Sequence, residues 1–165
     1  MPAAAPRGYS RLQIRLHWAV VGLVVLQYVL HDGVASAFDR GMEVGTLTLS
    51  APAIGHFAVG SLIFLLAAWR LLVRQERGAP EPPAEDPPWQ RALARSTHAA
   101  MYALMLALPV SGGIAWAMAS EAGSTTHEVM RALLLLAIVL HVAGAVYGQA
   151  VQKTGVIDRM RRPVD

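Results

Sequence analysis

The sequence predicts an all-α protein, an integral membrane four-helix bundle. Of its 165 residues, 55% are hydrophobic and only 15% are charged, whereas a soluble domain carries about a quarter charged residues. Four apolar blocks follow one another, each close to the ~20 residues that cross ~30 Å of hydrocarbon as a helix. Lipid offers no hydrogen-bond partner to a bare backbone, so each block must be helical. We expect a single four-span membrane domain over residues 1-165.

The four spans are expected at about 14-34, 51-73, 97-118 and 127-151. The first block is apolar apart from Arg15, His17 and Gln27, and the second is interrupted only by His56 and Arg70. The third contains one histidine and no charge, and the fourth is apolar after its first turn. Helices of a soluble bundle need a polar stripe facing water, and these blocks lack one. Membrane lipid is therefore the expected surrounding.

The segments between the blocks are more polar. Residues 32–50 are expected to form a mixed loop, residues 75–90 an extended loop rich in proline and acid, and residues 119–126 a short turn. Pro109 with two following glycines predicts a kink in the third span. A cleavable signal peptide is not expected, because no small-residue cleavage site with a polar start follows the first block.

The basic residues predict the orientation. Twelve of the fourteen lysines and arginines lie in the N-terminal segment, the proline-rich loop with its flanks, or the C-terminal segment. Only Arg40 and Arg131 remain for the other side. Both termini are therefore expected in the cytoplasm. The net charge of +3 then reflects the orientation of the chain in the membrane, so it does not indicate binding to nucleic acid, and we expect no nucleic-acid partner. The absence of cysteine excludes disulfides and thiolate metal sites.

Histidines are the candidate functional residues. Ionisable side chains are costly inside a membrane, so each is a functional hypothesis by default. A lone membrane histidine often makes a helix–helix hydrogen bond, but all four blocks carry one: His17, His56, His98 and His141. The expected topology places His17 and His98 near the cytoplasmic face, and His56 and His127 near the outer face.

The spacing on the last span indicates a cofactor. His127 and His141 are fourteen residues apart, which corresponds to ~21 Å along a helix and to within ~40° of one face. Two imidazoles at two depths are compatible with two haems, each bridged to a histidine of another helix. Zinc is the alternative, but it needs three or four converging ligands. His17 and His31 are also fourteen apart, so spans one and four could hold both haems by themselves.

Several segments, in this order along the chain, resemble the bacterial cytochrome b-561 family, which is related to the cytochrome b subunits of nickel hydrogenases and formate dehydrogenases. The resemblance runs from about residue 9 to residue 163. It rests on Arg11-Leu-Gln-Ile-Arg-Leu-His17-Trp18, on Ile54-Gly-His56, on Thr97-His98 with Tyr102 and Leu108-Pro109-Val-Ser-Gly112, and on Thr126-His127-Glu128 followed by Leu140-His141.

The resemblance implies a multi-pass protein of the bacterial inner (plasma) membrane with two haems b. Such a protein moves electrons between a donor and the quinone pool, with ubiquinone as the expected substrate. Carried over by position, His17 and His141 are the axial ligands of the inner haem iron, and His56 and His127 those of the outer one. The family pattern places no ligand at His31, which is then an interfacial side chain.

Other polar residues near the spans have open roles. His98 could hydrogen-bond a quinone, contact a haem propionate or replace His17 as a ligand. Arg15, Arg70 and Arg131 could pair with propionates, because arginine forks match carboxylates, or could be snorkelling anchors. Lys153, at the inner rim, could serve a quinone carbonyl.

Two functions remain open, together with whether the chain is an enzyme. One is a superoxide:ubiquinone oxidoreductase that resembles the superoxide oxidases of this family. The other is a non-catalytic subunit that relays electrons from a partner dehydrogenase or soluble cytochrome. The outer segments place Arg40 and Arg131 against five acidic residues. Superoxide is an anion, so this balance favours a basic donor protein instead. A haem-free transporter is disfavoured because the spans hold so few carboxylates.

Overall fold

The structure is a computed structural model that describes residues 6–83 and 86–164. The described residues form five α-helices and one short 3-10 helix. They are α1 (Arg11–Val29), α2 (His31–Glu43), α3 (Ala51–Arg77), α4 (Pro88–Ala117), α5 (Glu121–Ala150) and η1 (Asp158–Met160). Four of them, α1, α3, α4 and α5, are long and apolar enough to cross a membrane. The predicted all-helical fold with four spans is confirmed.

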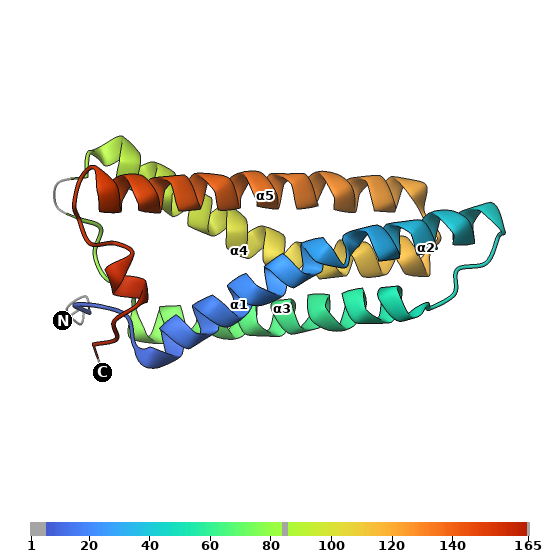
Figure 1. Cartoon of the computed structure of the whole chain (residues 1–165), viewed down its shortest axis with the longest axis horizontal. Helices are drawn as coiled ribbons and strands as arrows, with labels where there is room; N and C mark the ends of the chain where they lie inside the picture. Colours follow the sequence, from blue (N-terminus) through green and yellow to red (C-terminus); the bar gives the residue numbers. More distant parts are fainter. Residues whose placement is uncertain (1–5, 84–85, 165) are drawn as a thin grey trace.

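The four long helices run along the long axis of the molecule and alternate in direction (Figure 1). The start of α1, the end of the described C-terminal segment and the end of α3 with the start of α4 lie at one end, which we call the near end. The opposite, far end holds α2 and the turn between α4 and α5. The most extensive contacts are those of α4 with α5, followed by those of α1 with α3 and of α3 with α4. The bundle is thus two helix pairs joined through α3 and α4.

Polar turns extend the helices beyond the apolar blocks. Ser10 caps α1 in a capping box with Gln13, and Ser120 caps α5. Both α3 and α4 have proline in the first turn, and Gly78 ends α3 with φ 76°. Consequently α4 and α5 begin before the predicted residues 97 and 127, and the proline-rich connection is shorter than expected. Residues 84 and 85 of that connection lie outside the described residues.

Residues 31–43 form a helix where a loop was expected, so that prediction was wrong. The first span ends at Val29 instead of near residue 34, and Leu30 in αR conformation leads directly into α2. The α2 helix packs against α3 and buries Ala37, Phe38 and Gly41. Spacings of three and four residues place these on one helical face. The charged residues that alternate with them hide the helix from a search for long apolar runs.

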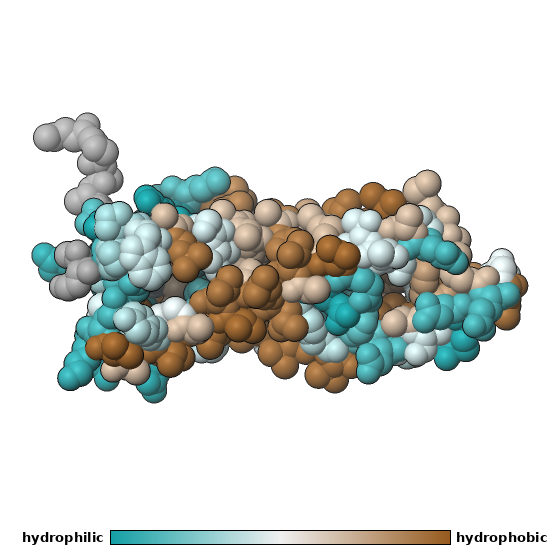
Figure 2. Space-filling model, turned by 90° about the horizontal axis from the view of Figure 1, so that it is seen from above, coloured by the Kyte–Doolittle hydropathy of each residue, from teal (hydrophilic) through white to brown (hydrophobic). Residues whose placement is uncertain are grey.

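The surface is apolar around the middle of the bundle. Figure 2 shows hydrophobic residues gathered over the central part of the long axis and hydrophilic residues toward the two ends. In the most apolar windows of α4 and α5 only 11% of the residues are buried. Such a belt is expected of helices that face hydrocarbon rather than water.

Candidate functional site

Two pairs of histidines face each other across the bundle. The near-end pair joins His17 on α1 to His141 on α5, with ring centres 6.4 Å apart and ring planes at 70°. The far-end pair joins His56 on α3 to His127 on α5, with ring centres 6.3 Å apart and planes at 66°. Helix α5 therefore contributes one imidazole to each pair, at two levels of the bundle.

The pair separations match what an ion between two imidazoles requires. Two metal–imidazole bonds of about 2 Å each, in line through one ion, place the ring centres roughly 6 Å apart. Both pairs have this separation, whereas the rings of His98 and His141 are only 4.9 Å apart. Haem iron takes axial histidine ligands, and one ligand on each side of the ring needs no further protein donor. The ring separations of both pairs therefore fit haem.

The surroundings of His127 suit a metal ligand. Its Nδ1 lies 3.1 Å from the carbonyl oxygen of Leu108 and 3.1 Å from the hydroxyl of Ser111. When the N–H at Nδ1 donates to a carbonyl oxygen, the tautomer of the ring is fixed and the lone pair of Nε2 is left for a metal. Residues on α4 thus orient an imidazole that belongs to α5.

His56 is buried and has an unusual polar atom. Only 9% of the residue is exposed, and its Nδ1 has no hydrogen-bond partner among the described residues. Its backbone carbonyl accepts a hydrogen bond of 3.0 Å from Nε2 of Gln27, which ties α1 to α3. Buried polar atoms without partners are uncommon and call for an explanation. A role of this imidazole in binding a cofactor would provide one.

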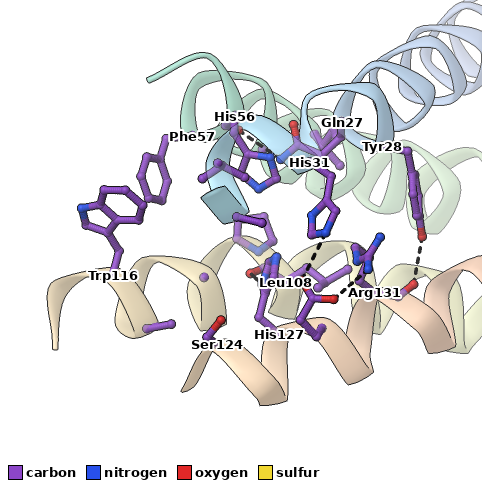
Figure 3. Close-up of a pocket in the computed structure, with 18 of the residues that line it drawn as sticks. Gln27, Tyr28, His31, His56, Phe57, Leu108, Trp116, Ser124, His127 and Arg131 are labelled. Carbon is purple, nitrogen blue, oxygen red and sulfur yellow. Dashed lines mark hydrogen bonds and ion pairs between the residues drawn. The ribbon is translucent and has the colours of Figure 1, made fainter. Parts of the chain in front are cut away.

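A cavity of about 290 Å³ lies beside the far-end pair. Figure 3 shows its labelled residues on α1, α2 and α3 at one side and on α4 and α5 at the other. Phe57 and Trp116 contribute apolar walls, with ring centres 5.4 Å apart. Gly60 and Gly112 also line the cavity, where side chains would narrow it. A largely apolar cavity with a few convergent polar groups is typical of a cofactor site.

The polar rim of this cavity links α1 and α2 to α5. Glu128 binds Nε2 of His31 at 3.3 Å and the guanidinium of Arg131 at 2.7 Å. The Tyr28 hydroxyl donates to the backbone carbonyl of Arg131 at 2.9 Å, and its ring lies under that guanidinium. His31 and Tyr28 point toward α5 in Figure 3. The predicted residue Arg131 is therefore placed at the far-end site.

Near the other pair, polar side chains from four helices meet. The guanidinium of Arg70 on α3 contacts Nδ1 of His17 at 2.6 Å and donates to the Tyr102 hydroxyl on α4 at 2.9 Å. His98, also on α4, has its Nδ1 2.6 Å from the carbonyl oxygen of Ala94. Its ring meets that of His141 edge-on. His98 thus lies at the near end, on the level of the first pair.

Two predicted residues do not join these clusters. Arg15 is exposed on α1, and Lys153 is exposed in the turn after α5, with φ 56°. Within the described ranges neither hydrogen-bonds a near-end histidine. Conversely, Gln27 and Tyr28 lie at the far-end site but were not among the residues predicted from the sequence. Their polarity within an apolar block was the available signal, but their partners on other helices were not visible in it.

Four apolar helices with two facing histidine pairs define a class of membrane haem protein. The chain belongs to the prokaryotic cytochrome b561 family, whose pattern matches residues 8–163. It is therefore a membrane electron-transfer protein of the cytochrome b561 type that uses haem b. The resemblance predicted from the sequence is confirmed.

Two relatives extend this comparison. The chain is 29% identical to a cytochrome b562 of Cereibacter sphaeroides over 159 residues, which is 94% of this chain and 96% of the relative. It is 27% identical to cytochrome b561 homolog 1 of Escherichia coli K12 over 104 residues, covering 63% of this chain and 56% of that protein. The first match spans nearly both full lengths, so the similarity to a cytochrome extends over nearly all of this chain.

Proposed function

We propose that the chain binds two haems b and carries electrons across the membrane. His17 and His141 hold one haem at the near end, and His56 and His127 hold the other at the far end. The observation that carries this proposal is the pair of ring separations, 6.4 and 6.3 Å, at two levels along one helix. When bound, haem supplies an iron centre that takes up and releases one electron.

The near end is assigned to the cytoplasm and the far end to the outside. Support comes from the basic residues, since twelve of the fourteen lysines and arginines belong to the near-end segments and their flanks. The electron donor then acts at the far end, where His127 lies within the first two turns of α5 and thus close to water. Both termini are cytoplasmic in this orientation.

The quinone is expected at the near end, close to His98. Its Nδ1 is already engaged with the carbonyl of Ala94 at 2.6 Å, so its Nε2 is the atom left to meet a ligand. Arg15 and Lys153 are exposed cations at the same end and could reach a quinone carbonyl or a lipid phosphate. Ubiquinone, a quinone with a long apolar tail, would reach this site from the lipid.

The charge of the far end favours one kind of electron donor over another. Asp32, Asp39, Glu43 and Glu121 are exposed there, and the exposed cation among them is Arg40. An acidic surface attracts a basic protein and repels an anion. This observation favours a relay from a basic soluble cytochrome or a partner dehydrogenase over a superoxide:ubiquinone oxidoreductase. In the latter reaction two superoxides become two dioxygen molecules while one quinone takes two electrons and two protons.

The test uses the purified protein in detergent with a soluble ubiquinone analogue. Pyridine haemochrome measurement should return two haems b per chain, and one or none would contradict the ligand assignment. Quinone reduction is then followed with two donors, enzymatically generated superoxide and a reduced basic c-type cytochrome whose potential lies below that of the quinone. Faster reduction by the cytochrome supports the relay. Quinone reduction that superoxide drives and superoxide dismutase abolishes would establish the oxidoreductase instead.

A further inference from the structure

Arg70 makes a hydrogen bond that constrains His17. Its guanidinium NH1 lies 2.6 Å from Nδ1 of His17, and its Nε donates to the Tyr102 hydroxyl at 2.9 Å. A guanidinium carries only donors and stays charged. Nδ1 of His17 must therefore accept, and the proton of a neutral ring then sits on Nε2.

This arrangement conflicts with iron ligation by His17. A neutral histidine that binds a metal through Nε2 carries its proton on Nδ1 and donates it to an acceptor. His127 has such an acceptor, because the carbonyl oxygen of Leu108 lies 3.1 Å from its Nδ1. His17 faces a cation instead. The hydrogen bond between Arg70 and His17 and the ligation of iron by His17 therefore exclude each other.

Arg70 must then turn to another acceptor when His17 binds iron. A carboxylate is the strongest match for a guanidinium, because two parallel hydrogen bonds form. Among residues 6–83 and 86–164, no aspartate or glutamate pairs with Arg70, and both ion pairs observed there involve Glu128 at the far end. Haem itself carries two carboxylates, its propionates.

We propose that Arg70 is the propionate-binding residue of the near-end haem. On this assignment its guanidinium leaves His17 and pairs with a propionate, while Tyr102 on α4 keeps it oriented through Nε. The far end differs, since Arg131 already pairs with Glu128 at 2.7 Å. The proposal thus predicts one strong arginine–propionate pair, at the near end. It rests on the proposed ligation of the near-end haem by His17 and His141.

The test reconstitutes the full-length apoprotein with haem b or with its dimethyl ester, whose propionates cannot bind a cation. The near-end haem is identified as the one that His141→Ala removes, and its retention is measured by transfer to apomyoglobin. In the unmodified chain the ester should leave the near-end site roughly tenfold faster than haem, as loss of a charge-assisted hydrogen bond predicts. In Arg70→Gln, haem and ester should leave at the same rate.

Arg74→Gln is the matched control, one turn further along α3, and should behave as the unmodified chain does. The midpoint potential gives a readout that a purely structural role would not move. It should fall at the near-end haem in Arg70→Gln, because a nearby positive charge favours the reduced state, and Arg70→Lys should restore it in part. If Arg70→Gln fails to assemble, the ester comparison is made with Arg70→Lys. In that variant the rates at which haem and its ester leave should differ by a smaller factor than in the unmodified chain.

If the ester leaves faster than haem by the same factor in the unmodified chain and in Arg70→Gln, the inference is wrong. The two haems and their proposed ligands would be unaffected by that result. If instead the unmodified chain holds one haem, or His141→Ala removes none, the proposed ligand pairs themselves are wrong. The two failures are therefore distinguishable.

Discussion

Gly112 on α4 lies directly against the imidazole of His127 on α5. A Cβ atom at Gly112 would stand 3.0 Å from Cε1 and 3.1 Å from Nδ1 of that ring. The same Nδ1 lies 3.1 Å from the carbonyl oxygen of Leu108, one turn before Gly112. The ring of His127 is thus oriented by a hydrogen bond and by close contact with a bare backbone. A side chain at this position would disturb a proposed haem ligand.

We predict that Gly112→Ala weakens haem binding at the far end. The added methyl group must push the ring of His127 away, and overpacking of this kind costs about 1–3 kcal/mol. Because His127 also holds iron in our proposal, the haem content should fall from two toward one per chain. Pyridine haemochrome measurement on purified protein checks this.

Gly113→Ala is the matched control for that variant. A Cβ at Gly113 would meet nothing within 4 Å, although the residue is adjacent in the same helix. It should retain both haems and the spectrum of the unmodified chain. Equal loss of haem in both variants would show that alanine disturbs α4 itself and not the contact with His127.

His141→Ala should remove one haem and leave the other. The variant deletes one member of the near-end pair, whereas the far-end pair lies at another level of α5 and keeps both of its imidazoles. Haem content should therefore be one per chain, and a redox titration should show one transition. Loss of both haems in a protein that remains folded by circular dichroism would mean that the sites are not independent.

His31→Ala should keep both haems. Nε2 of His31 lies 3.3 Å from a carboxylate oxygen of Glu128, and its ring belongs to neither facing pair. We expect a haem content of two per chain and at most a small loss of stability, since a partly exposed polar contact of this kind contributes about 0–1 kcal/mol. A haem content of one would instead make His31 a ligand and revive the alternative in which α1 and α5 hold both haems.

Much of the fold could be predicted because lipid removes alternatives. An apolar block long enough to span hydrocarbon must be helical, so composition and length alone define α1, α3, α4 and α5. The same criterion cannot detect α2, whose charged residues resemble those of a loop. Its apolar residues at positions 37, 38 and 41 become informative only once α3 is present to bury them.

The candidate site, too, could be predicted only in part from the sequence. Four histidines could be proposed from spacing and family resemblance, because each is an expensive residue in an apolar block. The hydrogen-bond partners of these histidines could not be predicted, since the contacts of Arg70 with His17 and of Gln27 with His56 join residues far apart in the sequence. Such pairings depend on how the helices are rotated about their axes, which the amphipathic pattern of a membrane helix determines only weakly.

His98→Ala should slow quinone reduction without removing a haem. The ring of His98 lies 4.9 Å from that of His141, which is too close for an iron between them, and its Nδ1 is engaged by the carbonyl oxygen of Ala94. Nε2 is then left for a quinone carbonyl, and loss of one such hydrogen bond should lower the rate roughly tenfold. The measurement compares quinone reduction with haem content and with haem reduction by the far-end donor, and the last two should not change. If the variant loses a haem, His98 is a ligand and the near-end pair must be reassigned. If quinone reduction is unaffected, the quinone binds elsewhere.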